Sequence, residues 1–210
     1  MNRELKEIIK NEKNNYLSHI TTIKEYWSIR LIHDEAYEIF RWIRALRCAE
    51  YYGKQKQKSK SIWNRLMYLY YARSMNVLGG RLGYFISTDV LGNNVKLFHR
   101  GGIIINYRSV IGDGCKFHGD NCVGNNGESL ECPVLGKNVD VGIGAKIIGG
   151  VTIADDIKIG ANAVVTKSFM ESGITIAGVP AKKIGGGKIV INNTIKLWKS
   201  YINFQRPVLT

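Results

Sequence analysis

Val141-Gly-Ile-Gly-Ala-Lys146 is the first of four consecutive hexapeptides from which the fold of this chain can be predicted. The other three are Ile147-Ile-Gly-Gly-Val-Thr152, Ile153-Ala-Asp-Asp-Ile-Lys158 and Ile159-Gly-Ala-Asn-Ala-Val164. Each hexapeptide opens with an aliphatic residue, and most carry a small or β-branched residue in the fifth place. A period of six fits neither a 3.6-residue helix nor a strand that alternates every second residue. It is typical of a β-helix built from hexapeptide repeats.

The period extends from Leu91 to Met170 if the frame skips two residues at Ile103-Ile104 and allows an insertion from Asn125 to Val134. With three hexapeptides per turn, their first residues stack into three walls, with turns about 4.8 Å apart. The walls are Leu91-Ile111-Leu135-Ile153, Leu97-Phe117-Val141-Ile159 and Ile105-Val123-Ile147-Val165.

The corners between these walls need residues that tolerate positive φ, and Gly, Asn and Asp supply them at Gly136-Lys-Asn138, Asp155-Asp156 and Gly160-Ala-Asn162. Cys115 occupies a fifth place and is predicted to be a small core residue. The pattern predicts a mainly β fold, a left-handed parallel β-helix, whose hand is an exception to the right-handed crossover rule.

The chain has 210 residues, and the repeats divide it into three parts. Residues 1–83 are predicted to be an α-helical N-terminal region, residues 84–186 the β-helix and residues 187–210 a tail with a short strand and an amphipathic segment. Within the helical region we expect Lys54–Lys60 to be an exposed connector, Ser61 to cap the next helix and Gly79-Gly80 to end the helical part.

The composition limits the function classes. The formal net charge is +13, which would suit nucleic acid, an anionic membrane surface or an acidic ligand, but no nucleic-acid motif accompanies it. No apolar run approaches 18 residues, the N-terminus lacks an apolar signal core, and the four cysteines form no CxxC pair, so a cytoplasmic protein is expected.

The segment from Ile62 to Tyr71 has a rich apolar face next to the lysine run. That face would suit weak association with a membrane surface, or packing against the end of the coil or a partner subunit, and we favour the packing.

Three stretches carry a resemblance to a known family. They are Leu97-Phe-His-Arg-Gly-Gly-Ile-Ile-Ile-Asn106, Cys132-Pro-Val-Leu-Gly136 after a projecting loop, and Gly160-Ala-Asn-Ala-Val-Val-Thr-Lys167 followed by Gly178-Val-Pro-Ala-Lys182. In this order and spacing, over about half of the chain, they resemble the left-handed β-helix acyltransferases, within them the serine acetyltransferase-like group. That group includes O-acetyltransferases of surface-polysaccharide synthesis.

The resemblance implies an O-acetyltransferase that uses acetyl-CoA as co-substrate and needs no metal. His99 is the expected general base, because a neutral histidine suits proton transfer near neutral pH and because it lies in the stretch that matches the family's catalytic segment. His118, one turn along, is a second catalytic candidate or a packing residue. Cys132 stands where serine acetyltransferases have a second histidine, and we expect it to line the acceptor pocket.

The acetyl-CoA site is also predicted from the resemblance. Small residues on successive turns allow the pantetheine arm to approach the backbone, and Gly124, Gly142 and Ala161 are the candidates. Cations at the end of the coil would hold the phosphates, and Lys167, Lys182 and Lys183 are the candidates. A three-sided coil exposes flat walls and supplies only part of an acyl-CoA site, so we expect a homotrimer or a dimer of trimers.

Two departures from the serine acetyltransferases bear on the acceptor. One is Cys132, and the other is the missing aspartate that orients the first histidine, whose matching position falls near Tyr84 with no carboxylate before Asp89. We therefore expect a sugar hydroxyl of a surface-polysaccharide precursor as acceptor, with L-serine as the alternative. A non-catalytic scaffold stays open, whereas a zinc carbonic anhydrase would need three histidines and the coil has only two.

Overall fold

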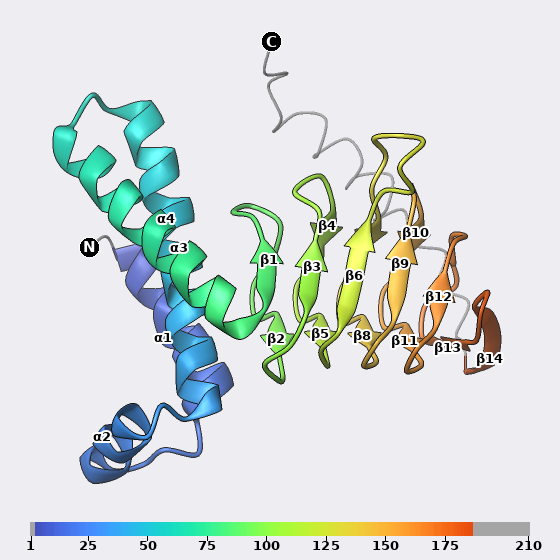
Figure 1. The fold of residues 1–210 in the computed structure, drawn as a ribbon, viewed down its shortest axis with the longest axis horizontal. Coiled ribbons are helices and arrows are strands. Elements are labelled where there is room, and N and C mark those ends of the chain that lie inside the picture. Colours follow the sequence, from blue (N-terminus) through green and yellow to red (C-terminus); the bar gives the residue numbers. More distant parts are fainter. Residues whose placement is uncertain (1–2, 187–210) are drawn as a thin grey trace.

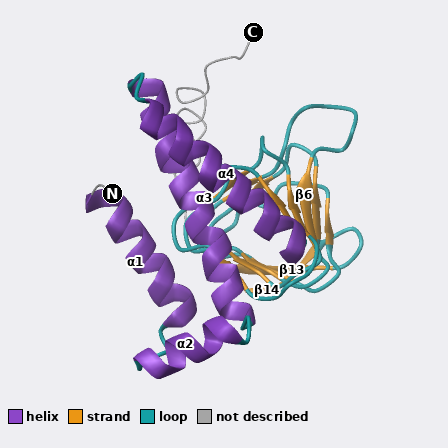
Figure 2. Ribbon diagram, turned by 60° about the vertical axis from the view of Figure 1, so that its left-hand side comes forward, coloured by secondary structure: helices purple, strands orange, loops and turns teal. Residues whose placement is uncertain are grey.

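Residues 3–186 are described by the computed structural model, and they form a bundle of helices joined end-on to a coil of short strands (Figures 1 and 2). The helices are α1 (Arg3–Leu17), α2 (Ile23–Leu31), α3 (Glu35–Lys58) and α4 (Ile62–Leu82). The predicted tail, 187–210, lies outside the described residues. No helix within residues 3–186 is long and apolar enough to cross a membrane.

The strands form the three faces of the coil. One sheet has the order β1 (Tyr84–Ile86), β3 (Ile103–Ile105), β6 (Asn121–Gly124), β9 (Lys146–Ile148) and β12 (Val164–Val165). The second has β4 (Val110–Ile111), β7 (Val134–Leu135) and β10 (Thr152–Ile153). The third has β2 (Lys96–Leu97), β5 (Lys116–Phe117), β8 (Asp140–Val141), β11 (Lys158–Ile159), β13 (Ile174–Ala177) and β14 (Lys182–Gly186).

The register confirms the predicted walls. Leu97 pairs with Phe117, Phe117 with Val141, and Val141 with Ile159, all in parallel. The other two walls pair in the same way, from Leu91 to Ile153 and from Ile105 to Val165. All twelve predicted wall residues are buried, so each turn adds a similar layer to one apolar core. The coil is a left-handed β-helix, as predicted.

The corners also confirm the prediction. Asn138, Asp156 and Asn162 have φ of 54°, 60° and 56°, the left-handed region that Asn and Asp tolerate better than most residues. Cys115 is fully buried, and burial raises the pKa of its thiol to about 12. The coil begins earlier than the first predicted hexapeptide, because Ile86 in β1 already pairs with Ile105.

Two predictions about the helices are wrong, and the one about Ser61 is confirmed only for its position. The lysine run is helical as far as Lys58, because Lys and Gln are good helix formers. Ser61 occupies the N-cap position but makes no capping hydrogen bond. The glycine pair at 79–80 does not end the helix, which continues to Leu82 and stops at Gly83 in the left-handed conformation, where glycine has no steric penalty.

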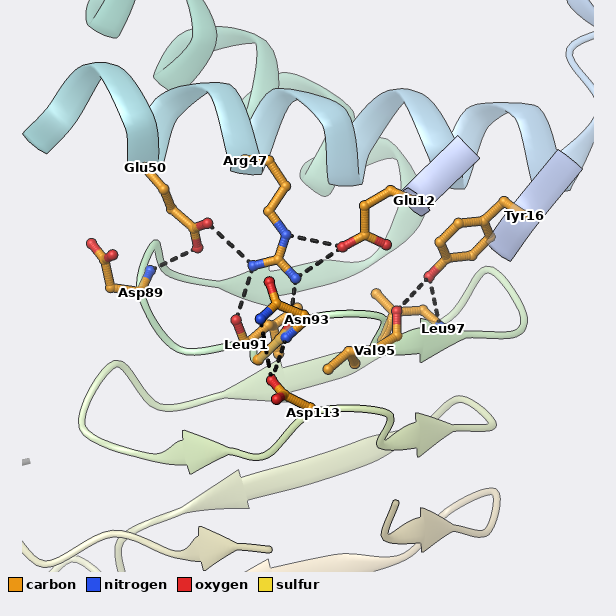
Figure 3. Close-up of polar contacts among 11 residues, drawn as sticks. Glu12, Tyr16, Arg47, Glu50, Asp89, Leu91, Asn93, Val95, Leu97 and Asp113 are labelled. Carbon is orange, nitrogen blue, oxygen red and sulfur yellow. Dashed lines mark hydrogen bonds and ion pairs between the residues drawn. The ribbon is translucent and has the colours of Figure 1, made fainter. Parts of the chain in front are cut away.

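A buried arginine joins the helices to the coil (Figure 3). The Arg47 guanidinium on α3 contacts Glu12 at 3.0 Å and Glu50 at 3.2 Å, and donates to the carbonyl oxygens of Leu91 and Gly92 in the first turn. Nearby, the Tyr16 hydroxyl donates to Val95 O and accepts from Leu97 N. These contacts satisfy backbone groups that the first turn would otherwise leave without partners.

Candidate active site

His99 lies at the corner between β2 and β3, where the third sheet turns into the first. Its side chain is 63% exposed, so it is free to meet a ligand. Its Nδ1 lies 3.3 Å from Glu35 Oε2, at the start of α3. The Tyr84 hydroxyl donates to the carbonyl oxygen of His99 over 2.8 Å, which fixes the backbone of the corner. A base with one nitrogen held and the other free is suited to proton transfer.

Glu35 is itself held in place. Its Oε1 accepts from the backbone N–H of Arg100 over 2.8 Å, while the Arg100 guanidinium donates to His33 O. Partial burial raises the pKa of Glu35, but the Arg100 N–H and His99 outweigh it and hold the pKa below its usual value. The carboxylate beside His99 is therefore ionised at neutral pH.

His118 has a carboxylate partner too. It follows β5, one turn after the His99 corner, and its Nε2 lies 2.8 Å from Asp140 Oδ1. Its ring stacks on Phe98, with centroids 4.5 Å apart and planes 8° apart. Because Phe98 precedes His99 in the chain, both histidines flank the same corner. The stacking on Phe98 and the contact with Asp140 hold the His118 ring from two sides.

Two of the predicted acetyl-CoA residues lie on this corner. Gly142 follows β8 and Ala161 follows β11, and backbone hydrogen bonds link His118 N to Val141 O and Gly142 N to Ile159 O. A Cβ at Gly142 would stand 2.7 Å from Ala161 N, so the turns approach closely here. His99, His118, Gly142 and Ala161 therefore lie at the same corner of four successive turns, just after β2, β5, β8 and β11 of the third sheet. We call this row of residues the column.

The other predicted residues lie elsewhere. Gly124, Cys132 and Lys167 lie at the next corner, after β6 and β12, where the first sheet turns into the second. Cys132 is buried at the end of the insertion that starts at Asn125, and its Sγ donates to Leu130 O at 3.7 Å. One chain therefore does not bring Cys132 to the corner that carries His99.

Lys182 and Lys183 lie in β14, the antiparallel strand that ends the described coil. Lys183 Nζ contacts Glu171 at 2.7 Å, so part of its charge is neutralised within the chain. Lys182 is exposed. Within residues 3–186, no three His, Cys, Asp or Glu side chains group as metal ligands.

Glu35 is the functional candidate that sequence reasoning missed. The sequence lacks the family's aspartate near Tyr84 and left the partner of His99 open, and the structure supplies a carboxylate from a helix 64 positions earlier. Tyr84 contacts the backbone of His99 instead of its ring. Asp34, which caps α3, marks where that helix begins, but no signal in the sequence places it against the coil.

The chain is similar in sequence to curated proteins. A serine acetyltransferase from Helicobacter pylori is 38% identical over 96 residues, which cover 45% of this chain and 56% of that protein. A serine acetyltransferase from Buchnera aphidicola is 27% identical over 196 residues, which cover 86% of this chain and 59% of that protein. No protein-family model matches the chain.

The fold has a close counterpart among solved structures. The serine acetyltransferase of Brucella abortus, in complex with coenzyme A, superposes with a TM-score of 0.67 at 21% identity, over 90% of this chain and 71% of that one. That likeness includes the helices as well as the coil. In sequence, the chain spans less than three fifths of the length of the two curated relatives described above.

Proposed function

We propose that this chain is a serine O-acetyltransferase that uses acetyl-CoA. The observation that carries the proposal is the sequence similarity of the chain to serine acetyltransferases. It is supported by His99 of this chain, which is exposed and has a carboxylate at its Nδ1. The relatives favour L-serine, the alternative in the sequence analysis, over a polysaccharide acceptor.

In the proposed reaction His99 is the general base. Glu35 accepts from the protonated Nδ1 and leaves Nε2 able to take the proton of the acceptor hydroxyl, as the hydroxyl oxygen bonds to the thioester carbonyl carbon. His99 then returns the proton to the departing thiolate sulfur as the C–S bond breaks. The ionised Glu35 stabilises the imidazolium that exists between the two steps.

The co-substrate would follow the column of turns beyond His99. Gly142 and Ala161 carry little or no side chain, so a pantetheine arm could come close to the turns there, and Gly124 would allow the same at the neighbouring corner. Lys182 and Lys167 are the proposed phosphate ligands, while Lys183 would have to leave Glu171 to take part. A cation far from the reacting carbon binds ground and transition states alike, so its loss raises KM more than it lowers kcat.

The active unit that we propose is a trimer, or a dimer of trimers. His99 and Cys132 lie at different corners of one coil, so a second coil is needed to bring a Cys132 to a His99. The outer face of the first sheet carries exposed Phe85 and Ile104 on paired strands, an apolar stripe that a neighbouring coil would cover.

A sugar hydroxyl is the second candidate acceptor. The observation in its favour is Cys132, a buried thiol that cannot act as the second histidine of serine acetyltransferases. A site that has lost a hydrogen-bonding partner discriminates less well, typically by about 10²-fold or more.

The test is release of free thiol from acetyl-CoA by the full chain, with L-serine and with a panel of sugars as acceptors. We expect serine-dependent release, and a lower kcat by about 10²–10⁴ in His99→Ala. His118→Ala, which removes an imidazole from the same corner, is the matched control and is expected to cost less. Release that depends only on sugars would move the proposal to the second candidate. No release with any acceptor, or a greater loss in His118→Ala, would contradict it.

A further inference from the structure

A cleft in the helical region, separate from the His99 corner, has an unusual lining. It encloses about 330 Å³ between α2, α3 and α4. Three arginines face it, namely Arg30, Arg41 and Arg44, and no carboxylate is among the described residues that line it. None of the predicted catalytic or acetyl-CoA residues lies in this cleft.

The positive charge of the cleft is only partly neutralised. Arg41 contacts Glu38 at 2.9 Å, and Glu38 also contacts His33 at 3.0 Å. The Arg30 guanidinium lies over the Trp27 ring, 4.9 Å from its centroid, which holds the group without removing its charge. Arg44, one turn after Arg41 on α3, has no ion pair with any described residue. Like charges at this spacing repel, so an anion between them would be stabilised.

Tyrosines supply the rest of the lining. Tyr26 and Tyr37 meet edge to face with centroids 5.8 Å apart, as do Tyr70 and Tyr71 at 5.1 Å. Burial and the neighbouring Tyr26 raise the pKa of Tyr37, so its hydroxyl keeps its proton at neutral pH and can donate. Guanidinium forks and hydroxyl donors match phosphate oxygens, while flat ring faces suit a planar or cyclic organic group.

We propose that this cleft binds a phosphorylated small molecule. The phosphate oxygens contact the guanidinium groups of Arg30, Arg41 and Arg44, and the organic part lies against the tyrosine rings. The volume is at the lower end of the range for small-molecule sites, which suits a nucleotide or a sugar phosphate. The proposal is independent of the transferase activity, since the cleft and the His99 corner share no residue.

The probe is inorganic pyrophosphate, titrated by calorimetry into the full chain. Arg30→Ala with Arg44→Ala removes two guanidinium groups and leaves Arg41 to hold Glu38. We expect this pair of substitutions to weaken pyrophosphate binding at least about tenfold, because it removes charge-assisted hydrogen bonds, which are roughly twice as strong as neutral ones. The matched control is Arg65→Ala with Arg73→Ala, which removes the same charge from exposed positions of α4 outside the cleft, and less than a twofold change is expected.

Two further measurements make the result specific. The KM for acetyl-CoA should be unchanged in both double variants, which separates this cleft from the proposed coenzyme site. Vesicles of phosphatidylglycerol test a lipid headgroup as the source of the phosphate, and no binding that depends on Arg30 and Arg44 is expected. The proposal is overturned if wild-type protein does not bind pyrophosphate, if both double variants lose equal affinity, or if only vesicles bind in an Arg30- and Arg44-dependent way.

Discussion

The coil and the helical region are held together by different physics. In the coil every turn repeats the same layer, with apolar wall residues inside and backbone hydrogen bonds to the next turn. The helices share that apolar core, with Trp42 against Tyr84. They also meet the first turn of the coil through buried charged and polar side chains, with Arg47 between Glu12 and Glu50 and Tyr16 at Val95 and Leu97. The coil therefore depends on many equivalent contacts, whereas the polar part of the junction depends on a few that cannot replace one another.

Single substitutions should therefore have different effects on the stability of the two regions. Loss of one layer contact leaves its neighbours in place, whereas loss of one partner at the junction leaves a buried charge without compensation. The largest effects on stability are therefore expected at the junction, and smaller ones in the turns of the coil.

The largest expected effect is that of Arg47→Met. Methionine keeps much of the packing volume but leaves Glu12 and Glu50 buried without their cation, and breaking a buried pair in this way typically costs about 3–5 kcal/mol. Urea unfolding followed by tryptophan fluorescence measures it. The control is Lys54→Ala, which breaks the exposed pair with Asp89 and should cost no more than about 1 kcal/mol. Equal losses of unfolding free energy in the two variants would show that the buried ion pairs at the junction contribute no more to stability than an exposed pair does.

Two glycine-to-alanine changes, one in the coil and one in the helical region, should give smaller changes in stability than Arg47→Met. A methyl group at Gly112 would overlap the backbone carbonyl of Gly136 on the next turn, so Gly112→Ala should destabilise the coil by about 1–3 kcal/mol. At Gly80 in α4 nothing lies within 4 Å of an added Cβ, and Gly80→Ala should stabilise the helix by up to about 1 kcal/mol. Thermal midpoints of the two variants should move in opposite directions. A shift in the same direction would contradict the close stacking of turns.

The smallest expected effect is a pH dependence at the junction. Burial raises the pKa of Glu12 above 4.5 even though Arg47 opposes it. A raised pKa means that the folded protein takes up the proton first, so this group adds stability as the pH falls through the folded pKa and loses it as the pH rises through the folded pKa. The thermal midpoint of wild type relative to Glu12→Gln, followed as the pH is lowered from 7 to about 4, should shift in favour of wild type. A raised pKa of Glu12 would be contradicted if the difference in thermal midpoint between wild type and Glu12→Gln stayed constant, or if it shifted in favour of Glu12→Gln as the pH fell.

The sequence predicted the coil well because its structure is local and repeated. Leu97 and Phe117 are both first residues of hexapeptides, and a period of six is enough to place one over the other. The hexapeptide frame itself begins only at Leu91, because β1 precedes the first full hexapeptide. The end of α4 was missed because Gly79 and Gly80 are tolerated in a helix that packs against Trp42 and Tyr84.

The candidate site was predicted only in part, for a related reason. His99 and His118 follow wall residues, so the repeat alone places both at one corner. Glu35 belongs to a helix whose position depends on the junction at Arg47 and Tyr16, and no local pattern encodes that position. Cys132 and His99 lie apart because their corners join different pairs of sheets. This separation becomes clear only when each strand is assigned to its sheet.

We propose that Glu35, on helix α3, holds the proposed general base His99 at the corner of the coil. A double-mutant cycle on kcat measures it most directly, with Glu35→Gln made in wild type and in His99→Ala. We predict that Glu35→Gln lowers kcat about tenfold in wild type, a coupling of about 1.4 kcal/mol, and has no effect when His99 is absent. An equal loss in both backgrounds would contradict the claim, because Glu35 would then act without His99.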